Sequence, residues 1–240
     1  MIELDPVEHI QVLFLFINIV SNHALSFVLI YKYFKSNIND LLFIALALLS
    51  TAIFNYYTFI ASYISILFTK TAIDTIYVLI FFPFSFLWIL FWALAYTKLV
   101  QRKHRKIIIL LITSFIAIFE IHYFTVFITD PYSIGEFKRG IYMDWSNFVS
   151  IYLLISMIIL VITTFDFGYK AINMGDKLIN FKAKFILSAV FFTFIAVLFE
   201  SIFTLHGFLF IIPRTLHICS GILMYVGFVL PKSIRNWLIK

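Results

Sequence analysis

Seven long stretches of this sequence carry either no charged residue or a single glutamate. The first lies between Glu8 and Lys32, and the second lies between Asp40 and Lys70. Because a helix needs about 20 apolar residues to cross the roughly 30 Å core of a bilayer, such stretches predict transmembrane helices. Pro83 predicts a kink in the third helix. The seven helices are expected at residues 9–31, 41–67, 73–98, 107–129, 146–168, 184–206 and 211–230.

The overall composition is typical of an integral membrane protein. Of the 240 residues, 63% are hydrophobic and 12% are charged, and the mean hydropathy is +1.04. A soluble fold of this size has too little interior to bury so much apolar surface, and a disordered chain needs low hydrophobicity. The stretches are apolar on every face, which excludes the alternating strands of a β-barrel. We therefore expect an all-α, polytopic protein of the cell membrane.

Lysine and arginine residues lie mainly on one side of the predicted helices. This side carries 14 of the 18 basic residues, and the acidic N-terminus lies on the other side. The positive-inside rule then places the N-terminus outside and the C-terminus in the cytoplasm, as an odd number of spans requires. Residues 231–240 are expected to form a cytoplasmic tail lying on the membrane surface. The net charge of +6 thus reflects topology, and no nucleic-acid binding is expected.

A compact basic cluster occupies the loop between the third and fourth predicted helices. Its members are Arg102, Lys103, Arg105 and Lys106. On the cytoplasmic face, such a cluster attracts anionic lipid headgroups. A docking surface for a cytoplasmic signalling protein is the alternative interpretation.

Polar residues inside the predicted spans are the main candidates for function, because ionisable groups in a bilayer are costly and usually mark a cavity or a partner. Asn55, Glu120 and Glu200 fall at a similar depth, roughly 21–24 Å from the inner ends of their helices. We expect an outward-facing cavity in which Glu120 and Glu200 meet Arg214. The alternative is that Arg214 only neutralises one carboxylate. The predicted ligand-binding residues are Asn55, Glu120, His122, Glu200, Arg214 and His217.

The sequence contains no recognisable catalytic or metal-binding motif. It has no His-Glu-x-x-His pair, no Cys-x-x-Cys pair, no Gly-x-Ser-x-Gly and no phosphate-binding loop. The seventh predicted helix also lacks a lysine that could form a Schiff base with retinal. We therefore expect neither an enzyme nor a bound metal or cofactor.

Several stretches of the third to fifth predicted helices resemble a known family. They are Pro83–Tyr96, Glu120–His122, Arg139–Gly140 with Tyr142 and Trp145, and Ile151–Leu154. In these stretches the chain resembles the seven-helix N-terminal sensor region of bacterial and archaeal histidine kinases. The resemblance implies signal reception on the outside or within the membrane. Because the sequence carries no kinase domain, the output is expected to pass through a separate cytoplasmic protein.

Two functions therefore remain open at this point. The first is a receptor-like sensor in which an outer ligand shifts helix packing and the basic inner face reports the shift. The second is a small membrane transporter with a site near Asn55, Glu120 and Glu200. A transporter must also open inward, whereas a sensor need not, and few polar groups are evident in the cytoplasmic half of the spans. We favour the sensor for this reason.

The orientation can be tested with a tag at each end of the chain. We expect an N-terminal tag to be accessible on intact cells and a C-terminal tag only after permeabilisation, because most basic residues then lie inside. Accessibility of both tags from the same side would contradict an odd number of spans.

Overall fold

The computed structural model describes residues 3–138, 142–202, 209, 211–231 and 234, and it describes no side chains for residues 52–56, 137, 138, 142 and 200–202. The fold is 88% helical, so the predicted all-α class is confirmed. The long helices are α1 (Pro6–Ser36), α2 (Asn39–Thr69), α4 (Leu87–Leu99), α5 (Arg105–Thr129), α6 (Asn147–Ile172), α7 (Lys177–Ile202) and α8 (Ile211–Val229). The short elements are α3 (Thr75–Phe81), the 3-10 turns η1 (Phe82–Phe86), η2 (Arg102–His104) and η3 (Pro131–Ser133), and the strands β1 (Gly135–Lys138) and β2 (Tyr142–Trp145).

Helices occupy most of the described residues of the predicted stretches, and several helices extend beyond the predicted ends. In the described part of the chain, six helical segments are long and apolar enough to cross a membrane, and α2 is 31 residues long. Helix α7 starts at Lys177 rather than at residue 184, because the Asp176 carboxylate accepts hydrogen bonds from the Leu178 and Ile179 backbone N–H groups. Helix α7 thus includes charged residues that lie before the uncharged stretch used to predict it. Membrane crossing and orientation stay predictions.

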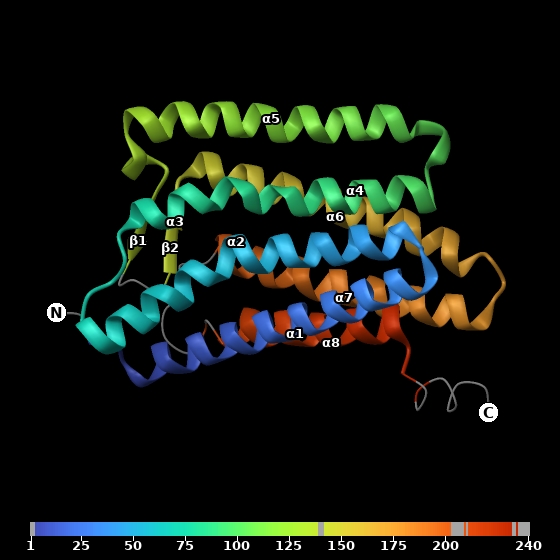
Figure 1. The fold of residues 1–240 in the computed structure, drawn as a ribbon, viewed down its shortest axis with the longest axis horizontal. Coiled ribbons are helices and arrows are strands. Elements are labelled where there is room, and N and C mark those ends of the chain that lie inside the picture. The colour runs from blue at the N-terminus through green and yellow to red at the C-terminus, as the bar shows by residue number, and fades with distance from the viewer. Residues whose placement is uncertain (1–2, 139–141, 203–208, 210, 232–233, 235–240) are drawn as a thin grey trace.

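The long helices lie roughly side by side along the long axis of the molecule (Figure 1). Helix α5 occupies one edge, with α4 and α6 next to it, and α1 and α8 lie at the opposite edge. Helices α7 and α8 approach closely at Gly227, where an added Cβ would lie 2.6 Å from Ile186 Cγ1. Small residues allow such close approach between apolar helices. Because α5 and α8 lie at opposite edges, the width of the bundle separates them.

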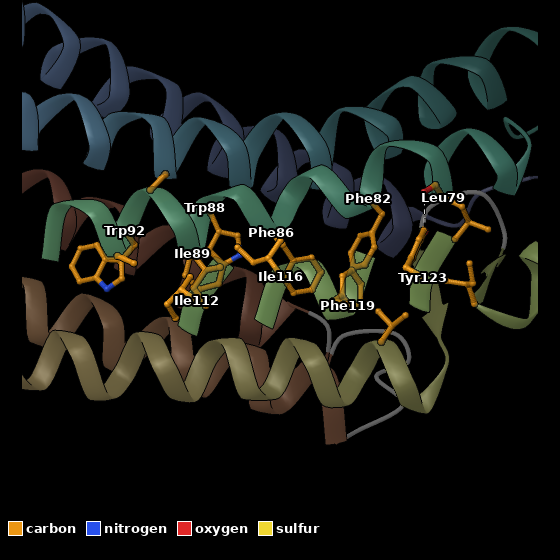
Figure 2. Packing of buried hydrophobic residues seen from close by; sticks show 14 of the residues in the cluster. Leu79, Phe82, Phe86, Trp88, Ile89, Trp92, Ile112, Ile116, Phe119 and Tyr123 are labelled. Carbon is orange, nitrogen blue, oxygen red and sulfur yellow. Dashed lines mark hydrogen bonds between the residues drawn. The ribbon is translucent and has the colours of Figure 1, made fainter. Parts of the chain in front are cut away.

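At Pro83, where a kink was predicted, a five-residue 3-10 segment interrupts the α-helix within one continuous helical rod. Here α3 gives way to η1 and then to α4. Proline has no N–H, so the carbonyl of Leu79, four residues earlier, loses its usual helical partner. The hydroxyl of Tyr123, a buried residue of α5, donates to this carbonyl oxygen at 2.8 Å (Figure 2). The interruption is thereby stabilised from a neighbouring helix.

An aromatic core surrounds this interruption. The Phe86 and Phe119 ring centroids are 4.2 Å apart, and the Phe82 and Trp145 centroids are 4.0 Å apart. Trp145 ends the β1–β2 hairpin, which is antiparallel and pairs Gly135 with Trp145. The segment between α5 and α6 therefore packs onto the core beside η1. The half of the bundle formed by α3 to α6 is filled mainly by large rings (Figure 2).

Replacing Tyr123 with phenylalanine tests the role of this hydrogen bond. We expect the free energy of unfolding to fall by about 1 kcal/mol, because the Leu79 carbonyl then stays buried without its donor. The matched control is Tyr132→Phe, since Tyr132 is exposed. Reversible unfolding in mixed micelles measures both variants. Equal stability of the two variants would show that the freed carbonyl is satisfied in another way.

Candidate functional site

The structure distributes the predicted ligand-binding residues over two sides of the bundle. Glu120 and His122 belong to α5, whereas Arg214 and His217 belong to α8. Helix α5 packs on α4, and α8 packs on α7 and α1. The structure therefore does not bring Glu120 and Arg214 into one cavity (Figure 1). The side chains of Asn55 in α2 and Glu200 in α7 lie outside the described residues.

On the α5 side, the two predicted residues have different surroundings. The Glu120 side chain is half-buried and forms no hydrogen bond or ion pair with the residues that the structure describes. His122 is exposed, and its ring centroid lies 4.1 Å from that of Phe148 in α6. His122 therefore packs against an aromatic ring beside α6, on a different face of α5 from Glu120.

On the α8 side, polar groups enter the interior of the bundle. His217 is only 9% exposed and Arg214 is half-buried. One turn further along α8, the buried Ser220 shares a 2.7 Å hydrogen bond with Thr193 of α7. Glu200 also belongs to α7, so this side of the bundle carries three of the predicted residues on adjacent helices.

Helix α1 adds a row of polar residues that the sequence reasoning missed. Asn18, Asn22 and Ser26 follow one another at four-residue spacing, and the Asn22 amide donates to Asn18 Oδ1 at 2.8 Å. Asn18 and Ser26 are buried. A Cβ added at Gly221 of α8 would lie 3.7 Å from Ser21 Cβ, so α1 and α8 meet at this level. The four-residue spacing is visible in the sequence, but the sequence analysis considered Asn55, charged residues and histidines as the polar candidates.

We call these residues of α1, α7 and α8 the polar seam. It comprises Asn18, Asn22, Ser26, Thr193, His217 and Ser220. The polar seam contrasts with the aromatic core around η1, because the helices α7 and α8 are joined here by a hydrogen bond between small polar side chains, Thr193 and Ser220.

His23 of α1 contacts α2 beside the polar seam. His23 Nδ1 donates to the carbonyl of Ile19 at 2.8 Å, because a carbonyl oxygen can only accept. Its Nε2 lies 2.7 Å from the Tyr57 hydroxyl, which can donate to a neutral ring. His9, at the start of α1, makes a similar contact of 2.8 Å with Tyr63. Two histidine–tyrosine pairs thus connect α1 to α2.

An open recess lies where α1 begins and α2 ends. It has a volume of about 300 Å³, a size suited to a small molecule. It is lined by Glu3, Leu4, His9, Ile66, Leu67 and Lys70. The lining combines the acidic Glu3 and the basic Lys70 with apolar side chains.

At the other end of the bundle, side-chain contacts connect the helix ends. One oxygen of the Asp166 carboxylate accepts from the Tyr96 hydroxyl at 2.6 Å, from Lys170 Nζ at 2.9 Å and from Gln101 Nε2 at 3.1 Å. The Tyr96 bond joins α4 to α6, the Gln101 bond joins the segment after α4 to α6, and the Lys170 bond lies within α6. Lys98 forms a 3.1 Å ion pair with Asp40 of α2. Sequence reasoning missed these contacts of Asp166.

Two further contacts complete this end. Trp92 Nε1 donates to Thr163 Oγ1 at 2.8 Å, again between α4 and α6. The predicted lipid or partner contacts are all exposed: Arg102 and Lys103 lie in η2, and Arg105 and Lys106 begin α5. The basic cluster therefore projects from the end of α4 that Asp166 and Asp40 hold in place.

No family model, curated protein or solved structure matches this chain. Among the described residues, no group of three histidine, cysteine or acidic side chains is arranged to hold a metal ion. The structure thus defines an all-helical protein whose long apolar helices are compatible with membrane embedding.

Substitutions of Asp166 test the contacts at this end. Asp166→Leu is expected to lower the free energy of unfolding by about 2 kcal/mol, because the donors of Tyr96 and Gln101 lose their acceptor. Asp166→Asn keeps an acceptor oxygen and loses only a partly exposed charge, so we expect a loss of less than about 1 kcal/mol. Thermal unfolding in bicelles measures both.

The matched control is Asp130→Leu, because Asp130 is an exposed residue after α5 whose side chain forms no hydrogen bond or ion pair with the residues that the structure describes. Equal losses for Asp130→Leu and Asp166→Leu would mean that the hydrogen bonds to Asp166 contribute nothing to stability.

Proposed function

We propose that this protein is a receptor-like sensor of the cell membrane, with seven transmembrane helices, an outer N-terminus and a cytoplasmic C-terminus. Two observations support this placement. The long helices are apolar over most of their length, and the start of α1 and the end of α8 lie at opposite ends of the long axis (Figure 1). An odd number of antiparallel crossings would produce that separation.

The asymmetry between the two ends of the bundle carries the proposal. In the proposed orientation, the recess beside His9 and Lys70 opens to the outside. At the cytoplasmic end, Asp166 joins α4 to α6, and Lys98 joins α4 to α2. A sensor needs access from one side only, so this arrangement suits reception outside and a rigid output surface inside.

The polar seam supplies an element that a ligand could shift. Helix α1 lines the recess at its outer end and carries Asn18 and Asn22 further along. A ligand that moves the outer end of α1 would change its hydrogen bonds and its packing on α8. We propose that the exposed basic cluster presents the resulting change to a separate cytoplasmic protein or to anionic lipid.

The transporter alternative receives less support from the arrangement of its proposed site. That site needs Asn55, Glu120 and Glu200, which belong to α2, α5 and α7. Helix α5 packs on α4, and α7 packs on α6 and α8. In the described part of the chain, α5 therefore does not pack extensively against α2 or α7.

Spin-label distances test the sensor directly. Labels at Lys103→Cys and Met174→Cys, in a Cys219→Ser background in nanodiscs, report the separation of the two cytoplasmic turns. The probe is a millimolar mixture of the common amino acids, chosen because the recess carries both charges. We expect the mixture to shift the distance distribution, because ligand binding at the recess biases helix packing.

The control variants separate the recess from the opposite side of the bundle. Lys70→Gln should abolish the response, whereas His122→Phe should retain it, because His122 lies on α5. Uptake of the same amino acids into proteoliposomes would instead support the transporter. Absence of any shift in the wild-type protein would contradict a sensor for this ligand class.

A further inference from the structure

Glu120 lies at the depth of the helix interruption, near the middle of the outermost helix. The preceding residue, Phe119, packs on Phe86 of η1 at 4.2 Å. Glu120 follows the start of α5 at Arg105 by 15 residues, or roughly 22 Å of helix. In the membrane placement proposed above, the carboxyl group therefore lies within the hydrocarbon core.

The structure offers this carboxyl group no internal partner. Among the described side chains, none donates a hydrogen bond to Glu120 or forms an ion pair with it. Arg214, its expected partner, belongs to α8 at the far edge of the bundle (Figure 1). An unpaired carboxylate in hydrocarbon is costly, so Glu120, which has no partner among the described side chains, either takes up a proton or binds a cation.

The faces of α5 show from which direction a partner can approach. Ile116 and Tyr123, one turn away on the core side, are buried. Ala117 and Phe124, one turn away on the other side, are exposed. Because residues three and four positions apart share a helix face, Glu120 lies on the border between the core and the outer surface. That surface contacts lipid in the proposed placement.

We propose that Glu120 is a bilayer-facing carboxyl site that binds a lipophilic ammonium ion. The ammonium N–H group would donate to the carboxylate, and its apolar tail would lie along the exposed face of α5 beside Ala117 and Phe124. This inference rests on the membrane placement in the proposed function, but it is independent of the outer recess and of signalling.

A hydrophobic carbodiimide tests access to the site from the bilayer. The O–H of a carboxylic acid adds across a C=N bond of dicyclohexylcarbodiimide to give an O-acylisourea. The acyl group then migrates to nitrogen and forms a stable N-acylurea, so no atom leaves. For the wild-type protein in nanodiscs, we expect an adduct on Glu120 by peptide mass spectrometry. A water-soluble carbodiimide should not modify this residue.

Competition tests binding of the ammonium ion itself. The probe is N,N-dimethyldodecylamine, which is protonated at neutral pH and cannot form an amide, and dodecanol is the uncharged control. We expect the amine to slow labelling of Glu120 by about fivefold or more, which corresponds to about 1 kcal/mol of protection, and dodecanol to leave the rate unchanged. Glu120→Gln should abolish the adduct, whereas Glu136→Gln, in the exposed strand β1, should not.

Each contrary result overturns the site in a different way. Equal slowing by amine and alcohol would show that the ammonium charge is not recognised. Labelling by the water-soluble reagent would place Glu120 in an aqueous cavity, and labelling that appears only at low protein-to-lipid ratio would show that a second copy covers it. The sensor proposal fails separately, through absence of a distance change at the cytoplasmic turns, and only a failed tag experiment would remove both.

Discussion

The hydrogen bond from Tyr123 to the carbonyl of Leu79 is the contact on which the arrangement of α3 to α6 depends. Backbone groups away from water must be satisfied by the protein itself, and Pro83 removes the donor that would satisfy Leu79 within its own helix. Because the replacement donor comes from α5, it fixes the position of α5 against the interruption. The rings of Phe82, Phe86 and Phe119 then fill the space around it.

The molecule consequently has two halves with different packing. Large rings around η1 occupy α3 to α6, and an aromatic side chain has few alternative positions in a filled interior. Small polar side chains occupy the seam of α1, α7 and α8, where Ser220 bonds Thr193 and Asn22 bonds Asn18. In the sensor that we propose, the aromatic core would serve as the frame, and the polar seam would be the contact that a ligand changes.

The local properties of the sequence predicted the helices but not the contacts between them. The helical class followed from apolar length and is confirmed, and Pro83, where the missing N–H predicted a kink, lies in the 3-10 segment η1. The expected meeting of Glu120 with Arg214 was not found, because depth along a helix does not determine which helices are neighbours. The hydrogen bonds of Asp166 were missed because a charged residue at the edge of an apolar stretch can still lie inside a helix. From there it can bond to a residue of a neighbouring helix.

The sequence by itself determined that this chain forms long apolar helices, where one of them breaks, and which residues carry charge, since these properties depend on the identity and spacing of neighbours along the chain. Only the tertiary structure decided that Glu120 lies apart from Arg214, that Tyr123 supplies the donor for Leu79, and that Asn18 lies on the helix that packs against α8. Lateral contacts between helices depend on packing across the whole bundle, which apolar runs of similar composition do not encode locally.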